Sequence, residues 1–134
     1  MILLYILLGV STLVVAVLVF LFLFPVIQIC GYSMFPTMTD GEFHLGRRVF
    51  RKTKCKVGEI YVFKPPYASD GERYVVKRLS SIKTSRGSDT KYYFLGDNAD
   101  ESYDSRYYGF VDCKSVVAHI KLRKEVLANG VQED

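Results

Sequence analysis

The sequence predicts a mainly β protein: a small all-β domain tethered to a single N-terminal transmembrane helix. Two observations lead to this fold class. The first 24 residues carry no charged side chain, and a helix of that length spans about 36 Å, enough to cross a hydrocarbon core of about 30 Å. The rest of the chain is rich in Tyr, Val and Phe in short alternating segments and shows no sustained helical period. We therefore expect an anchor at residues 1–27 and one domain at residues 28–134, a length that suffices for a single core.

The apolar run has two other interpretations, a cleaved signal peptide and a buried core helix. A signal peptide has a basic start, a shorter apolar stretch and a small-x-small cleavage site. Here no Lys or Arg precedes Arg47, and no Ala-x-Ala follows the run. A core helix of this length would need more protein around it than remains. A transmembrane anchor is preferred, and Pro25 is expected to end or kink it because proline lacks an amide donor.

The charge pattern leaves the orientation of this anchor open. The first basic pair, Arg47 and Arg48, follows the span, and the Lys/Arg bias taken alone would place the domain in the cytoplasm. These bases lie about 20 residues from the end of the helix and inside a folded domain, where the bias has little weight.

Five segments of the domain are expected to form strands, because each alternating run is bounded by turn residues. In chain order they are residues 42–50, 59–64, 73–80, 91–95 and 116–123. The predicted turns are Asp40-Gly41, Lys64-Pro65-Pro66, Asp70-Gly71, Arg86-Gly87-Ser88-Asp89 and Gly96-Asp97-Asn98. Residues 121–129 could end the domain as a short helix.

Charge and cysteine content exclude some classes of function. The formal net charge of +4 is mild and its bases alternate with acids, which is typical of a solvated surface and compatible with some attraction to anionic lipid head groups. Nucleic-acid binding is not supported, because there is no recognised motif and no long basic block. The cysteines Cys30, Cys55 and Cys113 form no CxxC pair and no zinc pattern with His44 and His119. A disulfide between Cys55 and Cys113 is left open.

A serine follows the anchor closely, in Gly31-Tyr32-Ser33-Met34-Phe35-Pro36-Thr37. Its hydroxyl becomes a nucleophile only when a base takes its proton, and neither histidine has a suggestive context. A neutral lysine can replace histidine in this role. In a strand, Val75, Lys77 and Leu79 share one face, and burial there would lower the pKa of the amine. The alternative is an ordinary strand lysine that points to water.

A third polar segment occupies residues 96–106, with a dense run of Asp, Asn and Ser. It could be a simple polar turn. A calcium loop is disfavoured, because the ligand spacing and the closing glutamate of an EF-hand are missing.

Together these segments resemble bacterial type I signal peptidases, the membrane-bound serine proteases that remove signal peptides. The resemblance runs from residue 27 to about residue 120 and rests on four ordered blocks. They are Gly31-Tyr32-Ser33-Met34-Phe35-Pro36-Thr37-Met38 with Asp40-Gly41-Glu42, then Gly58-Glu59-Ile60-Tyr61-Val62-Phe63-Lys64, then Val76-Lys77-Arg78, and residues 96–106. Any one block could arise by chance, whereas all four in order behind an anchor are highly specific.

The resemblance implies roles for individual residues. Ser33 would be the nucleophile and Lys77 the general base, with the Ser102 hydroxyl orienting the amine. Asp104 and Arg106 would pair as a scaffold beneath the site, and Arg78 would be structural. The residues that bind substrate or form the wall of the site would be Ile29, Gly31, Met34, Pro36 and Val75. The lysine also sets the subtype, because endoplasmic-reticulum and archaeal relatives resemble this pattern with histidine at that position.

The resemblance also implies the setting of the reaction. The domain would have coiled, partly barrel-like sheets and lie on the extracytoplasmic side of the plasma membrane. Exported preproteins would be the substrates, cleaved after small residues of the Ala-x-Ala type through an acyl-enzyme, without metal or organic cofactor. The lipid bilayer and the protein-export machinery are the expected partners.

Two departures from the family pattern stand out. Some members have a serine two residues before the nucleophile whose hydroxyl helps to bind the oxyanion, and here that position is Gly31. The oxyanion hole would then depend mainly on backbone N–H groups. The interval between Arg78 and Tyr92 is too short for the second subdomain of larger members, which predicts a minimal catalytic core with a hairpin around Arg86-Gly87-Ser88.

Other functions remain open at this level. The same blocks fit a specialised processing peptidase for a pilus or conjugation precursor, or an organelle inner-membrane peptidase. A self-cleaving repressor-type protease is disfavoured by the anchor. A catalytically silent membrane-tethered binding domain is the alternative from another class, and the joint presence of Ser33, Lys77 and Ser102 argues against it.

Overall fold

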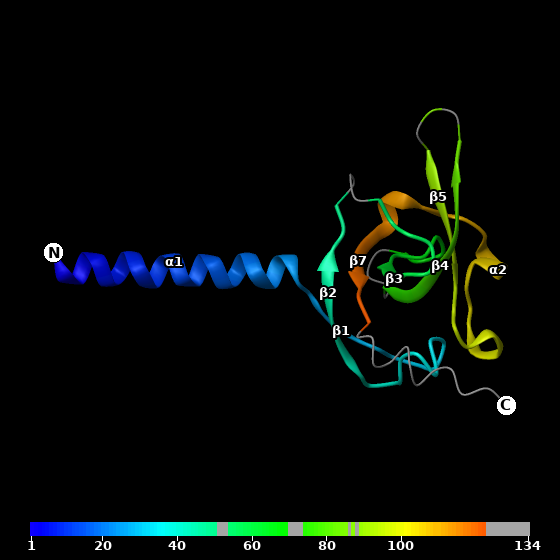
Figure 1. Cartoon of the computed structure of the whole chain (residues 1–134), viewed down its shortest axis with the longest axis horizontal. Coiled ribbons are helices and arrows are strands. Elements are labelled where there is room, and N and C mark those ends of the chain that lie inside the picture. The colour runs from blue at the N-terminus through cyan, green and yellow to red at the C-terminus, as the bar shows by residue number, and fades with distance from the viewer. Residues whose placement is uncertain (51–53, 70–73, 86, 88, 123–134) are drawn as a thin grey trace.

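The protein consists of one long helix followed by a curled β domain (Figure 1). A computed structural model describes residues 1–50, 54–69, 74–85, 87 and 89–122. Helix α1 (Ile2–Leu23) is apolar throughout and none of its residues is buried. Its length and composition are sufficient to cross a membrane. The helix ends two residues before Pro25, as expected from the missing amide donor of proline.

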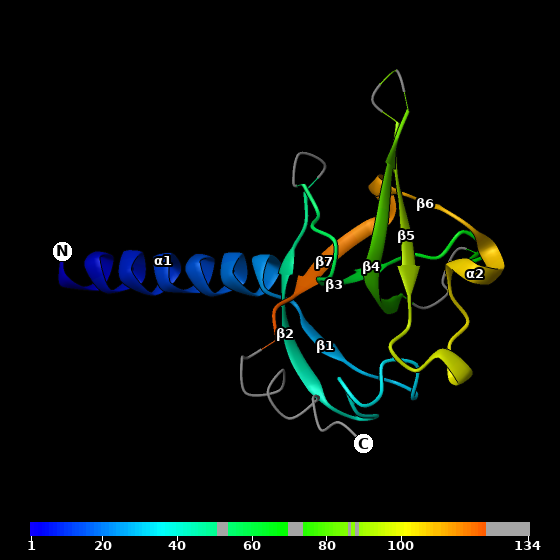
Figure 2. The ribbon, with the colours of Figure 1, turned by 45° about the vertical axis from the view of Figure 1, so that its right-hand side comes forward.

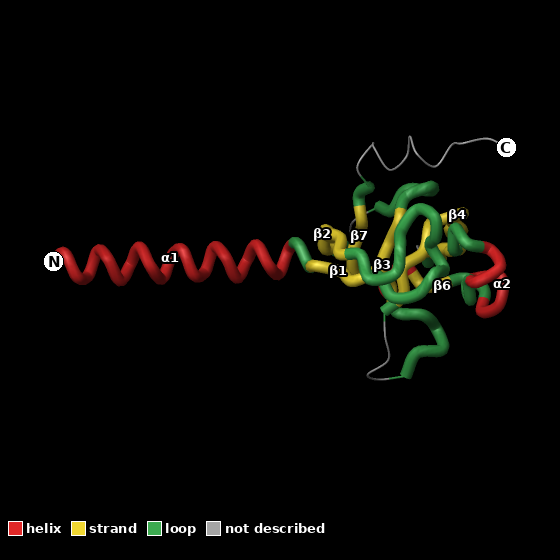
Figure 3. Tube along the Cα trace, turned by 90° about the horizontal axis from the view of Figure 1, so that it is seen from below, coloured by secondary structure: helices red, strands yellow, loops and turns green. Residues whose placement is uncertain are grey.

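The domain is a seven-stranded antiparallel sheet that curls into a half-barrel (Figure 2). Its strands are β1 (Val26–Gln28), β2 (Phe43–Arg48), β3 (Ile60–Phe63), β4 (Val75–Thr84), β5 (Thr90–Leu95), β6 (Val111–Asp112) and β7 (Val116–Ile120). Their order across the sheet is β1-β2-β7-β3-β4-β5-β6. The helical turns of the domain are η1 (Ala99–Glu101), α2 (Ser105–Tyr108) and η2 (Cys113–Ser115). The predicted fold class is confirmed, and Figure 3 shows the strands gathered at one end of α1.

Strand β3 lies at the centre of two hydrophobic clusters, one on each face. Tyr61 and Phe63 belong to the first cluster, in which Phe63 and Phe94 stack with ring centroids 4.1 Å apart. Ile60 and Val62 belong to the second. All four side chains of β3 are buried, because alternation places them on opposite faces and both faces are covered. This doubly covered strand explains the continuous apolar run in the sequence.

The five predicted strands all exist, with different ends. The observed β2 and β3 are shorter than residues 42–50 and 59–64, and β7 ends at Ile120, whereas β4 runs on to Thr84. Residues 80–84 of β4 are exposed and largely polar, so hydrophobic alternation gave no signal for them. Two short strands, β1 and β6, were not predicted. Strand β1 begins at Val26, inside the segment assigned to the anchor.

Some predictions fall outside the described residues. They are the turn at Asp70-Gly71, Arg73 at the start of the third predicted strand, Arg86 and Ser88 of the hairpin turn, and the predicted helix at residues 121–129 beyond its first two positions.

Candidate active site

Ser33 lies in a turn between β1 and β2 whose neighbouring side chains are anchored in the core. The Met38 N–H donates to the Met34 carbonyl at 3.0 Å, and both methionine side chains are fully buried in the second cluster. The Gly31 N–H donates to Asp40 Oδ1 at 2.7 Å. Gly31 has a φ of 90°, a left-handed conformation that favours glycine. The turn therefore holds Ser33 at its surface while its neighbours fix the backbone.

Asn98 attaches this turn to the loop after β5. Its backbone N–H donates to the Ser33 carbonyl at 3.0 Å, and its side-chain amide donates to the Tyr32 carbonyl at 3.1 Å. Within the described residues, the Ser33 N–H makes no hydrogen bond. The carbonyl of Ser33 is thus held on one side, and its N–H is left available to a ligand.

Lys77 lies on β4, directly across from Tyr61 of β3. Its residue is only 4% exposed, and Leu79 on the same face is fully buried. Burial lowers the pKa of Lys77 to about 8; the Asp104 carboxylate opposes this shift and the Arg106 guanidinium adds to it. Desolvation disfavours the ammonium form. The amine is therefore neutral in a substantial fraction of molecules at mildly alkaline pH.

Ser33 and Lys77 line the same cavity, which has a volume of about 430 Å³. The wall also contains Ile29, Met34 and Val75, three residues that the sequence analysis assigned to it. Gly31 and Pro36 do not line this cavity. Pro36 is exposed, and the Gly31 N–H is directed to Asp40. The remaining lining residues were not singled out from sequence: Gln28, Cys30, Tyr67, Tyr74, Val76 and Tyr103.

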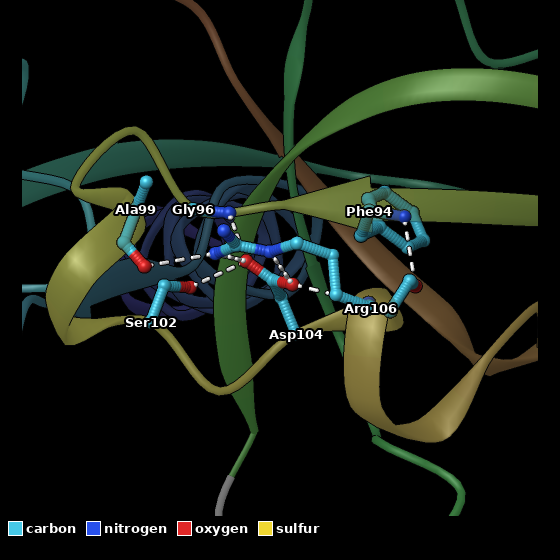
Figure 4. Close-up of polar contacts among 7 residues, drawn as sticks. Phe94, Gly96, Ala99, Ser102, Asp104 and Arg106 are labelled. Atoms are coloured by element: carbon cyan, nitrogen blue, oxygen red, sulfur yellow. Dashed lines mark hydrogen bonds and ion pairs between the residues drawn. The ribbon is translucent and has the colours of Figure 1, made fainter.

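A buried carboxylate, Asp104, organises the segment beside this cavity (Figure 4). It is fully buried and accepts hydrogen bonds from the Ser102 hydroxyl at 2.8 Å and the Gly96 N–H at 2.9 Å. The Arg106 guanidinium donates to both of its oxygens, at 2.9 and 2.8 Å. The neighbouring Ser105 hydroxyl accepts from the Phe94 N–H at 2.9 Å. These bonds fix the polar segment 96–106 against β5.

The same contacts determine the charge of Asp104. Burial raises the pKa of this carboxyl, but the hydrogen bonds from Arg106, Gly96 and Ser102 outweigh burial and hold the pKa well below its usual range. Asp104 is therefore ionised throughout the neutral range. Because Ser102 gives its proton to Asp104, the Ser102 oxygen keeps its lone pairs for another donor.

Arg78 follows Lys77 in β4 and contacts a different part of the structure. Its guanidinium forms a bidentate pair with Asp97, with Nε to Oδ1 at 2.8 Å and Nη2 to Oδ2 at 2.6 Å, and also donates to the Gly58 carbonyl. Asp97 accepts a further hydrogen bond from the Thr37 hydroxyl at 2.5 Å. Arg78 and Asp97 thus connect β4 to the turn that carries Ser33.

Gly96 lies where the polar segment 96–106 approaches the turn that carries Ser33. A Cβ at this position would lie 2.0 Å from the Ser102 Oγ and 2.6 Å from the Ser33 carbonyl oxygen. Glycine is needed here for space. Sequence reasoning treated Gly96 and Asn98 only as a turn, because their contacts with Ser33 cross more than 60 residues of chain.

Gly96→Ala is expected to destabilise the protein by about 1–3 kcal/mol, the usual cost of overpacking, and to reduce peptidase activity by displacing Ser102 or Ser33. Thermal unfolding and cleavage assays measure the two effects. Gly9→Ala is the matched control, because a Cβ there meets nothing within 4 Å. Unchanged stability and activity in Gly96→Ala would contradict the close approach.

Comparison with known proteins agrees with the resemblance drawn from the sequence. A family model described as signal peptidase, peptidase S26, matches residues 2–86 and 80–124, which together span most of the chain. None of the curated proteins compared with the chain matches it. Because the family match covers the helix, the turn that carries Ser33, β4 and the polar segment, the chain belongs to the peptidase S26 family of signal peptidases.

Proposed function

We propose that this protein is a type I signal peptidase that cleaves exported preproteins with Ser33 as nucleophile and Lys77 as general base. One observation carries the proposal: Ser33 and a buried lysine whose pKa is lowered to about 8 line one cavity. Perturbed lysines in a cleft are typical of catalytic bases, and a serine needs such a base to react.

In the proposed reaction, the neutral Lys77 amine takes the proton of the Ser33 hydroxyl as its oxygen attacks the scissile carbonyl. The tetrahedral intermediate collapses to an acyl-enzyme, the peptide C–N bond breaks, and Lys77 protonates the leaving amine. Water then enters, gives a proton to Lys77 and hydrolyses the ester. The signal peptide leaves with a new carboxylate, and Ser33 regains its proton.

Ser102 would position the base. Its hydroxyl donates its proton to Asp104. Its oxygen is therefore left to accept a hydrogen bond, which the Lys77 amine would donate. That hydrogen bond would direct the lone pair of the neutral amine toward Ser33. Asp104 and its Arg106 partner would hold Ser102 in place.

The oxyanion hole would include the Ser33 N–H, which makes no hydrogen bond within the described part of the chain. A preorganised backbone donor stabilises the charge that develops on the carbonyl oxygen. Gly31 provides no hydroxyl donor, and its own N–H is occupied by Asp40. The hole would thus rest on backbone groups of the turn.

Substrate would enter the cavity as an extended segment. The wall contains the end of β1 at Gln28 and the start of β4 at Val75, so a peptide could lie between them and pair as a strand. Ile29, Met34 and Val75 narrow the space beside Ser33, which would favour small side chains such as alanine.

The membrane placement is part of the same proposal. Helix α1 would cross the plasma membrane once, and the β domain from residue 28 would lie on the extracytoplasmic side. The nucleophile turn follows the end of α1 by only ten residues, so the cavity would stand close to the lipid surface. A signal peptide held in the same bilayer would present its cleavage site at that level.

The pH dependence of cleavage tests the proposal. With the full chain in detergent and a preprotein with an Ala-x-Ala site, kcat/KM should rise about tenfold per pH unit below pH 8 and level off above it, because only neutral Lys77 can accept a proton. The Ser33→Ala chain is the control for background cleavage. A rate that stays flat between pH 6 and 9 would contradict the lysine base, and equal cleavage by the Ser33→Ala chain would contradict the serine nucleophile.

A further inference from the structure

We propose that a second cavity, formed by β2, β7 and the segment before β3, binds the phosphate of an anionic phospholipid head group. This basic cavity has a volume of about 260 Å³. It shares no lining residue with the cavity of Ser33 and Lys77. Its cationic lining residues are Arg47, Arg48, Lys54 and Lys56, and its other lining residues are Val49, Phe50, Glu59, Tyr61 and His119.

The charge of this cavity is strongly positive. Four cationic residues and one carboxylate, Glu59, line the cavity, and that carboxylate already has partners. It accepts a hydrogen bond from the Tyr61 hydroxyl at 2.9 Å and lies 3.1 Å from His119 Nε2. Glu59 therefore offsets little of the charge of Arg47, Lys54 and Lys56, whereas the Arg48 guanidinium is held at Phe22. Arg and Lys are the residues that proteins use to bind phosphate.

Burial and the nearby cations lower the pKa of the His119 ring. Arg47 lies directly opposite His119 in the pairing of β2 with β7. Burial lowers the pKa of His119; Glu59 opposes the shift, and Arg47 and Lys56 are among the cations that lower it further. His119 is thus neutral and adds no charge to the cavity, and its Nε2 already lies beside Glu59.

Arg48 places the cavity at the end of α1. Its Nε donates to the Phe22 carbonyl at 2.8 Å, and its guanidinium carbon lies 4.3 Å above the centre of the Phe22 ring. Phe22 belongs to the last turn of α1. If α1 spans the bilayer, its last turn marks the edge of the hydrocarbon, and the basic cavity lies at the level of the lipid phosphates.

The position of the cavity points to a lipid head group as its ligand. The positive charge of the cavity points to an anionic head group. A zwitterionic choline lipid would bring its own ammonium group toward the cations of the cavity, whereas phosphatidylglycerol carries a phosphate without a counter-charge. The inference rests on the membrane placement of α1 proposed above and does not depend on the catalytic roles of Ser33 and Lys77.

The chain contains no tryptophan, so Phe50→Trp creates a single fluorescent reporter in the cavity. The full chain with this reporter, in maltoside micelles, is titrated with phosphatidylglycerol, with phosphatidylcholine and with inorganic phosphate at constant ionic strength. We expect a saturable emission shift with phosphatidylglycerol at a lower mole fraction than any shift with phosphatidylcholine. Adding Lys54→Ala and Lys56→Ala should raise the half-saturating fraction about 30-fold, from two lost charges near the lipid surface.

The matched control is the pair Lys83→Ala and Lys91→Ala, two exposed lysines that face each other across β4 and β5 outside the cavity. It removes the same net charge and should shift half-saturation less than about twofold. An equal loss in this control, or an equal response to phosphatidylcholine, would overturn the site. Saturation by inorganic phosphate that prevents any further response to phosphatidylglycerol would overturn its assignment to lipid.

Alkaline washing of vesicles that contain the parent chain separates this inference from the placement of α1. A chain released by the wash contradicts the membrane helix itself. A chain that is retained but shows no preference for phosphatidylglycerol overturns the phosphate site alone.

Discussion

Replacing Lys77 with methionine is expected to abolish cleavage and, at pH 7, to stabilise the fold. Loss of the proposed base should cost at least about 10⁴-fold in kcat/KM, as does loss of a catalytic residue in other serine peptidases. Lys77 has a pKa of about 8 in the folded protein against about 10.4 when unfolded. Because the folded pKa is lower, the ammonium form destabilises the fold by on the order of 3 kcal/mol below pH 8, and this cost fades as the pH rises toward 10.4.

Cleavage assays and thermal unfolding at pH 7 measure the two effects on the same preparation. Lys83→Met is the matched control, because Lys83 lies on the same strand and is exposed. It should change neither quantity appreciably. Residues that act as one unit are non-additive, so Ser33→Ala, Lys77→Met and the double variant should share one residual rate. Cleavage by Lys77→Met near the parent rate would remove Lys77 from the mechanism.

Asp104→Ala is expected to give the largest loss of stability at neutral pH, about 3 kcal/mol or more. The variant leaves the Gly96 N–H and the Ser102 hydroxyl without their acceptor, and each unsatisfied buried group costs about 1–3 kcal/mol. Arg106 is 40% exposed at its side chain, so water can replace its partner at little cost. Denaturant unfolding of the full chain in detergent measures the difference.

Asp112→Ala provides the control for this variant. Asp112 is exposed and accepts one hydrogen bond from the Lys114 N–H at 2.8 Å, so its loss should cost only about 1 kcal/mol. The stability of the parent chain should also depend on pH. The pKa of Asp104 is lowered, so its stabilisation is present above about pH 4 and is lost as the pH falls. Equal stability of the Asp104→Ala and Asp112→Ala chains would contradict the buried network.

The sequence predicted the elements whose pattern is local. The anchor followed from uninterrupted apolar composition, and β3 from a buried apolar run between turns. Strand β1 was missed, because three residues after a helix carry no pattern of their own. Its conformation depends on pairing with residues 43–45 of β2. The outer half of β4 was also missed, since its exposed residues pair with β5 without an apolar face.

The candidate site shows the same division between features that local sequence patterns predict and features that they miss. The resemblance singled out Ser33, Lys77 and the polar segment, because these residue types occur in ordered blocks. It did not reveal that Asn98 holds the backbone of the turn that carries Ser33 or that Gly96 leaves room for Ser102. Such contacts depend on the curl of the sheet, which brings distant blocks within hydrogen-bond distance, and no local rule encodes that curl.

The position of β7 has a consequence for biosynthesis. In the described sheet, β1 and β2 flank the turn that carries Ser33, β3 to β5 form the part that contains Lys77, and β7 alone hydrogen-bonds to both groups. Its Ala118 and Ile120 share a cluster with Met34 and Met38. When Ser33 and Lys77 have already been synthesised, the growing chain still lacks this connecting strand. We therefore expect a chain that stops before β7 to leave the turn of Ser33 and the strand of Lys77 unconnected, because β2 and β3 have no other common neighbour in the described sheet.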